Sequence, residues 1–180
     1  RRTLLQLEQE RYHPKNWRPA VLAMGVGKDG RRRLAVFARW IAGRHGLLFT
    51  GQILTGNAEN HLERQQRQHK LLRKLSAEHN LAAFPAVLSA PRFSDGVAAL
   101  VQASGIGALR PNLLLLGWSR EEDKRADYVR ALRMAAGLGR SLAIMRLAED
   151  DDPPADPWTV PRGPIDVWWL GQSNGELMLL

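Results

Sequence analysis

Four residues in the first third of the chain have the types and spacing that phosphate binding needs. They follow a short apolar run and precede an amphipathic segment: Gly25, Gly27, Lys28 and Gly30. Glycines let the backbone approach a phosphate closely, and the first turn of a following helix presents free N–H groups. Because no Ser or Thr follows the lysine, the loop is not a P-loop, and we do not assign it as a dinucleotide fingerprint. A phosphate or nucleotide site and a plain turn both remain open.

The other reactive side chains lack the neighbours that a catalytic or metal site requires. The five histidines show no ligand spacing: His13, His45, His61, His69 and His79. No serine stands in a nucleophile-elbow sequence, and the acidic run 150–152 lies beside two prolines, where solvated carboxylates are expected. We therefore assign no catalytic residue and no metal ligand, and we do not expect an enzyme.

Composition narrows the class of protein. The 180 residues are 44% hydrophobic, enough for one domain with a sizeable core and the start of another. The absence of cysteine excludes disulfides and thiolate chemistry and is compatible with a reducing compartment. No apolar run in the sequence approaches the roughly 18 residues that a transmembrane helix needs.

The basic charge is concentrated in one part of the chain. The net charge is +8, but residues 1–75 contain 16 basic and 5 acidic side chains, whereas residues 76–180 contain 10 and 13. Such a basic segment could face nucleic acid, an anionic membrane surface or solvent alone. Aromatic residues are not interleaved with the basic ones, and no zinc-finger or RNA-recognition pattern is present, so we do not expect nucleic acid as a partner.

Strand and helix patterns alternate along the chain. Short apolar runs predict five strands at 19–24, 46–54, 83–89, 112–118 and 141–147. Helical periodicity predicts four helices around 34–41, 57–79, 94–104 and 126–138, with Ser94 as the N-cap of the third. Right-handed crossovers between such elements predict an α/β fold with a doubly wound, mostly parallel, five-stranded sheet.

The C-terminal part has a different character. Residues 150–164 are acidic and then proline-rich, which predicts a linker, and 165–170 predict a strand. Neighbouring side chains on a strand face opposite sides, so Trp168 and Trp169 must be buried against two different surfaces. Both surfaces belong to this chain, or one of them belongs to a partner. With the apolar end at Leu179 and Leu180, these residues form a candidate partner interface and motivate an expectation of self-association.

Four separate motifs carry a resemblance to a known family. They are Asn16-Trp17-Arg18-Pro19, the second strand at 49–56, the segment 105–112 with Gly117-Trp118, and Ile165-Asp166-Val167-Trp168-Trp169-Leu170. In this order and spacing they resemble the cytosolic C-terminal domain of the cation-chloride cotransporters, the potassium-chloride branch most closely at 165–170. The compact form, without long insertions, suits a prokaryotic member.

The resemblance implies a domain without chemistry of its own. It implies a connecting helix from the membrane domain at 1–14, a first α/β half similar to universal stress proteins at 15–149, a linker at 150–164 and the start of a second half at 165–180. The implied role is regulation and dimerisation on the cytoplasmic side of the cell membrane. The implied partners are the chain's own transmembrane transporter domain and a second copy, and the basic half could meet anionic inner-leaflet lipid.

Nucleotide binding is a further implication of the resemblance. Some family members bind nucleotide in the first half, so ATP or another nucleotide could occupy the Gly25 loop; no other cofactor is expected. The stress-protein glycine loop after the fourth strand is missing from this sequence. The alternative function is a free-standing nucleotide-binding protein of the universal stress type.

Overall fold

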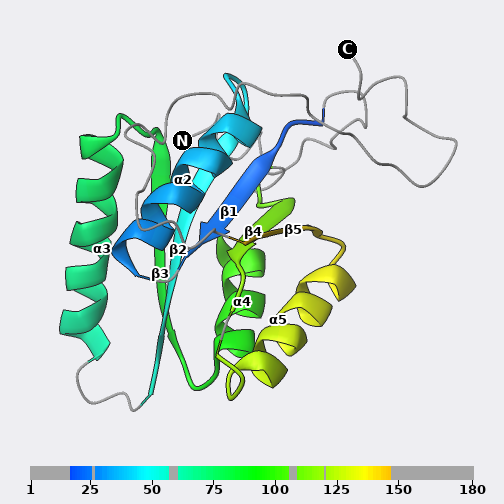
Figure 1. The fold of residues 1–180 in the computed structure, drawn as a ribbon. Coiled ribbons are helices and arrows are strands. Elements are labelled where there is room, and N and C mark those ends of the chain that lie inside the picture. The colour runs from blue at the N-terminus through cyan, green and yellow to red at the C-terminus, as the bar shows by residue number, and fades with distance from the viewer. Residues whose placement is uncertain (1–16, 26, 57–60, 106–108, 120, 147–180) are drawn as a thin grey trace, which may run out of the picture.

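The computed structural model describes residues 17–25, 27–56, 61–105, 109–119 and 121–146 (Figure 1). Strands and helices alternate along this part of the chain. The strands are β1 (Ala20–Met24), β2 (Leu47–Thr55), β3 (Ala83–Ala90), β4 (Leu113–Gly117) and β5 (Ser141–Met145). The helices are α2 (Lys28–Ala42), α3 (His61–Glu78), α4 (Phe93–Ala103) and α5 (Arg125–Gly137). The expected connecting helix, linker and second half lie outside the described residues.

The five strands form one parallel sheet in the order β3-β2-β1-β4-β5. The chain first moves outward from β1 to β3, then returns past β1 to add β4 and β5 on the other side. This is the doubly wound topology predicted from the alternating pattern, and it confirms the α/β fold class.

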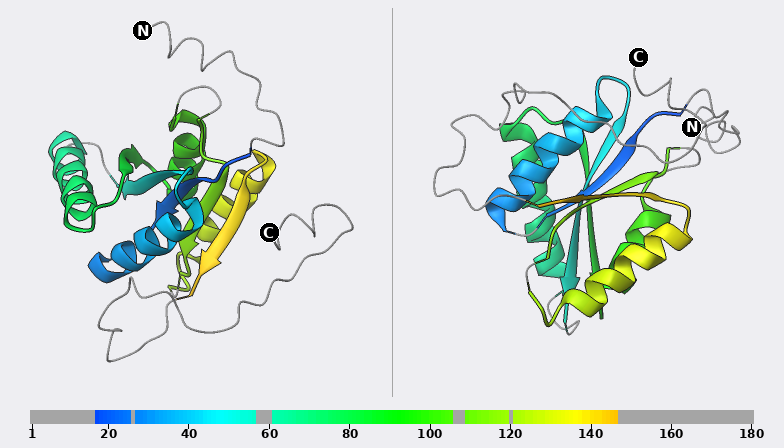
Figure 2. Two further views of the ribbon diagram at one scale, coloured as in Figure 1. Left: turned by 90° about the horizontal axis from the view of Figure 1, so that it is seen from above. Right: turned by 45° about the vertical axis from the view of Figure 1, so that its right-hand side comes forward.

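Helices cover both faces of the sheet (Figures 1 and 2). Helix α2 packs on β1, β2 and β4, and α3 packs on β2 and β3. On the opposite face, α4 contacts β2, β3 and α5, and α5 also contacts β5. Each face therefore has its own hydrophobic core, one under α2 and α3 and one under α4 and α5.

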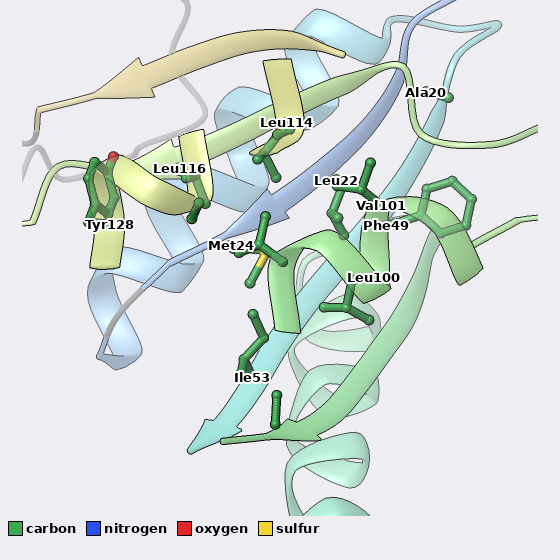
Figure 3. Close-up of a cluster of buried hydrophobic side chains, with 14 residues drawn as sticks. Ala20, Leu22, Met24, Phe49, Ile53, Leu100, Val101, Leu114, Leu116 and Tyr128 are labelled. Carbon is green, nitrogen blue, oxygen red and sulfur yellow. The ribbon is translucent and has the colours of Figure 1, made fainter. Parts of the chain in front are cut away.

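The central strands are buried because both faces are covered. In β4, Leu114 and Leu116 point to the core under α4 and α5, whereas Leu115 points to the core under α2. All three are almost completely buried, as the apolar run predicted. Figure 3 shows Leu22, Met24, Leu114 and Leu116 from neighbouring strands on the α4 side of the sheet.

Two predictions about the helices are wrong in detail. Ser94 is not the N-cap of α4: it lies inside the helix and is fully buried, and Arg92 occupies the N-cap position. The first-turn N–H groups of α4 instead meet a carboxylate from α5, a contact between segments far apart in sequence. In the fourth predicted helix, helical periodicity also predicts Tyr128, Val129, Leu132 and Ala136 to point inward; Tyr128 does, but Val129 and Ala136 are exposed, and Ala131 and Ala135 are buried instead.

Candidate ligand site at the carboxyl ends of the strands

A cavity lies where the strand order changes direction. Its volume is about 460 Å³, and its walls come from the carboxyl ends of β1, β2 and β4, the start of α4 and the β4–α5 connection. Met24, Ile53 and Leu116 contribute apolar surface, and Gly25 lies at its edge. In open α/β sheets, ligands bind at this topological switch point. The cavity is therefore the candidate functional site.

The four predicted phosphate-loop residues surround the start of α2. Gly25 follows β1 directly and lines the cavity, and Gly27 is the N-cap of α2. The sequence interpretation extended the loop to Gly30, but α2 already begins at Lys28. The turn closes early because the Gly27 carbonyl oxygen accepts a hydrogen bond from the N–H of Arg31 at 3.3 Å. Gly30 therefore belongs to the first turn of the helix.

The glycines at 25 and 27 have different structural roles. A Cβ on Gly25 would lie 2.9 Å from the Arg31 backbone and the Gly30 carbonyl oxygen, so only glycine lets the loop pack on the first turn of α2. Gly27 has a φ of 71°, and a Cβ there would meet nothing within 4 Å. The backbone at Gly27 is thus exposed and faces open space.

The structural context also corrects the earlier interpretation of this loop. Positions 25, 27 and 30 have the spacing G-x-G-x-x-G, which follows a strand and opens a helix within a β-α-β unit, as the dinucleotide fingerprint requires. The spacing could have been recognised in the sequence. Among the described residues at the end of β2, Thr55 and Gly56 offer no carboxylate to bind a ribose hydroxyl.

The first turns of α2 and α4 differ in their availability to an anion. Among the described residues, no side chain is hydrogen-bonded to the first-turn N–H groups of α2. At α4, the Asp127 Oδ2 accepts hydrogen bonds from the N–H groups of Phe93 at 2.9 Å and Ser94 at 3.3 Å. A carboxylate at a helix N-terminus satisfies these donors and complements the helix dipole. The first turn of α4 lines the cavity but its donors are occupied, whereas Gly27, Lys28 and Gly30 at the start of α2 lie beyond the cavity lining.

The two cationic side chains that line the cavity are already paired. Arg92 Nε lies 2.9 Å from the Asp95 carboxylate, and Lys124 donates to the Glu121 carboxylate. The hydrogen bond with Glu121 raises the pKa of Lys124 above its ordinary value. Neither cation is free to neutralise a ligand charge without giving up its carboxylate partner.

An aromatic wall bounds the cavity on the α5 side. The Tyr128 hydroxyl donates to the Gly117 carbonyl oxygen at 3.1 Å, and the Tyr128 ring stacks on Phe93 with centroids 6.4 Å apart. Burial raises the pKa of Tyr128 above its ordinary value, so the hydroxyl stays protonated and keeps donating near neutral pH. Ligand binding against this wall would rely on apolar and aromatic contact.

The remaining predicted site residues can be placed only in part. Trp168, Trp169, Leu179 and Leu180 lie outside the described residues. Within the described part of the chain, no group of His, Asp and Glu side chains is arranged to hold a metal ion. Among those same residues, no helix combines the length and the apolar character needed to span a bilayer. The cavity thus has the features of a binding site.

Comparison with known protein families gives a match to solute carrier family 12 over residues 31–153. The matched segment runs from the first turn of α2 through β5 and includes most of the sheet. It covers more than half of the chain and agrees with the resemblance drawn from the four sequence motifs. The chain therefore belongs to solute carrier family 12, the cation-chloride cotransporters.

Proposed function

We propose that this chain forms the cytoplasmic regulatory and dimerisation domain of a membrane cation-chloride cotransporter. Family membership implies a membrane-spanning transporter part, which the described helices do not supply. A regulatory domain can act on a transporter through binding and association. Family membership also favours this function over a free-standing stress-type protein.

The observation that carries the dimerisation proposal is the open edge of the sheet at β5. Within the described residues, β5 pairs with β4 on one side and with no strand on the other. Leu142 and Ile144 on this strand are 37% and 44% exposed. An apolar edge strand with unpaired backbone groups is a template for pairing with another strand.

The opposite edge of the sheet is less suited to pairing. Strand β3 contains Pro85, which has no N–H to donate, and proline on an edge strand discourages further pairing. β5 contains no proline. Two copies of β5 related by a two-fold axis perpendicular to the sheet would pair antiparallel, giving a closed, self-complementary interface. We therefore propose a second copy of this domain as the occupant of the β5 edge.

Light scattering on the purified chain tests this proposal. We expect twice the mass of the chain for the parent and a single-chain mass for Ile144→Lys, because a lysine at the edge opposes pairing. Phe84→Lys, an exposed apolar residue on β3, is the matched control and should remain dimeric. A monomeric parent, or dissociation by Phe84→Lys in place of Ile144→Lys, would contradict dimerisation through β5.

A second candidate function is nucleotide binding, which the uncapped first turn of α2 beside the cavity favours. We propose that phosphate groups meet the N–H groups at the start of α2, near Gly27 and Lys28, while a base occupies the apolar part of the cavity. The volume of about 460 Å³ is within the usual range for small-molecule sites. Binding of such a ligand would make transport respond to the concentration of the nucleotide.

Thermal unfolding with added ligands tests the nucleotide proposal. A ligand present at a hundred times its Kd stabilises the folded state by about 2.7 kcal/mol. We expect ATP to stabilise the parent and adenosine, which lacks phosphate, to stabilise it much less. No shift with ATP at millimolar concentration would exclude the site, and an equal shift with adenosine would exclude a phosphate contact.

A further inference from the structure

The topology gathers the basic residues on one face of the molecule. Helices α2 and α3 cover the same face of the sheet, and together contain ten lysines and arginines against three acidic residues, a formal charge of +7. Helices α4 and α5 on the other face contain three arginines against two acidic residues, a formal charge of +1. We call the outer surface of α2 and α3 the basic layer.

Several cations of the basic layer have no ion-pair partner among the described residues. The two acidic residues of α3 are each paired, Glu63 with Arg67 at 3.9 Å and Glu78 with Lys74 at 3.6 Å. The exposed cations of α3 that form no such pair with a described residue are Arg64, Lys70 and Arg73. These three side chains keep their full charge available for an external anion.

The basic layer also exposes large apolar side chains. Trp40 on α2 is 52% exposed, and Leu62 and Leu71 on α3 are 69% and 51% exposed. The Trp40 ring lies 5.6 Å from the Phe37 ring, so it rests on α2 with half of its surface in solvent. Leu62 and Leu71 are nine residues apart, about 180° around α3, so they lie on opposite sides of that helix. Arginine and lysine together with an exposed tryptophan are typical of binding at a membrane interface.

We propose that the basic layer docks on the anionic surface of the membrane that holds the transporter. This inference rests on the proposed function, because the transporter part would hold the domain beneath that membrane. Phospholipid headgroups such as phosphatidylserine supply the negative charge, and the interfacial zone accepts Trp40. Docking by this layer leaves the β5 edge free for a second copy.

Vesicle sedimentation with the full 180-residue chain tests the proposal, using phosphatidylserine–phosphatidylcholine vesicles against phosphatidylcholine alone. The test variant carries Arg64→Gln, Lys70→Gln and Arg73→Gln. The control, Arg125→Gln, Arg130→Gln and Arg133→Gln, removes the same charge from exposed positions of α5. Each cation near an anionic surface raises the partition constant roughly fivefold, so we expect a loss of roughly a hundredfold in the test variant and less than about fivefold in the control.

A further variant separates charge from apolar insertion. We expect Trp40→Ala to weaken binding even at high salt, where exposed charges are screened. The proposal would be overturned if the two triple variants lost vesicle binding equally, or if the parent bound both vesicle types equally. Tighter binding to duplex RNA than to vesicles would overturn it as well. Light scattering without vesicles reports dimerisation in the same preparations, so lipid docking can fail while the proposed function stands.

Discussion

A single polar side chain holds together the amino ends of the central strands. Asn112, just before β4, accepts a hydrogen bond from the Ala20 N–H at 2.9 Å and donates to the Arg18 carbonyl oxygen at 2.7 Å. Its own backbone continues the ladder to β1 through Ala20 and to β5 through Ser141. Two of the motifs that carried the family resemblance, around Pro19 and Asn112, therefore touch each other.

Asn112→Ala should reduce the free energy of unfolding by about 2 kcal/mol, because it removes both side-chain hydrogen bonds and leaves the part-buried Ala20 N–H without its acceptor. Urea unfolding followed by circular dichroism measures the change. Gln102→Ala, which removes a side-chain bond to the Ala98 carbonyl within α4, is the control and should change stability by less than about 0.5 kcal/mol. Equal effects of the two changes would show that Asn112 has no special role.

Ionisation of Tyr128 makes the free energy of unfolding depend on pH in the alkaline range. Burial raises the pKa of Tyr128 in the folded chain above its ordinary value of 10.0, so its contribution to stability is fully present below about pH 10 and is lost as pH rises through the folded pKa. Tyr128→Phe should cost about 1 kcal/mol at neutral pH, from the lost bond to Gly117, and should flatten the alkaline decline. Urea midpoints between pH 8 and pH 11 measure both effects; an equally steep decline in Tyr128→Phe would assign the pH dependence to other groups.

For single residues, the sequence indicated candidate site residues but not the residues that they contact in the fold. It singled out Gly25, Gly27 and Lys28, yet nothing local to Ser94 showed that α5 would provide the carboxylate for the first turn of α4. Asp127 lies 34 residues beyond Phe93, and only the packing of α4 against α5 brings them together. Capping by a distant residue has no short-range sequence signal, whereas the G-x-G-x-x-G spacing does.

At the scale of elements, α4 packs unusually close to β2. A Cβ on Gly96 would lie 2.6 Å from Ile53 Cγ2 and 2.9 Å from Ile53 Cδ1, so the glycine sets the distance between helix and sheet. Gly96→Ala should cost about 1–2 kcal/mol, because the overlap outweighs the gain of about 1 kcal/mol in helix propensity.

A double-mutant cycle checks this packing. With Ile53→Ala the clash disappears, so Gly96→Ala should become neutral or stabilising in that background. Gly137→Ala near the end of α5, where a Cβ would meet nothing within 4 Å, is the matched control and should not destabilise the fold. Urea midpoints of the five proteins give the coupling, and strictly additive effects would contradict the close packing.

Element positions followed from the sequence because the strands are short apolar runs bounded by glycine, proline or polar residues. The predicted strand at 83–89 and the observed β3 (Ala83–Ala90) differ by one residue, and α2 ends at Ala42, one residue beyond the predicted 34–41, with Gly43 as its C-cap. The start of α2 was missed because Gly30 was interpreted as part of a loop. A backbone hydrogen bond from Arg31 to Gly27 keeps Gly30 inside the helix.

At the scale of the whole molecule, the sequence showed a basic first half but not a basic surface. The surface arises because α2 and α3 follow consecutive right-handed crossovers in one direction and therefore share a face of the sheet. The return crossover places α4 and α5, with their lower charge, on the other face. The sheet edge at β5 is at the opposite end of the strand order from α3, so lipid docking and pairing with a second copy can occur together.

The dimer proposed at the β5 edge can be tested most directly by cysteine cross-linking, since the chain contains no cysteine of its own. Five variants each place one cysteine at a position from Ser141 to Met145. Antiparallel pairing across a two-fold axis brings one position opposite its own copy, with Cβ atoms about 5 Å apart. Mild oxidation and a non-reducing gel should show a linked dimer at that position, weaker linking at its neighbours, and none for Phe84→Cys on β3. Efficient linking at Phe84→Cys, or none anywhere along β5 in a chain that light scattering shows to be dimeric, would contradict the proposed interface.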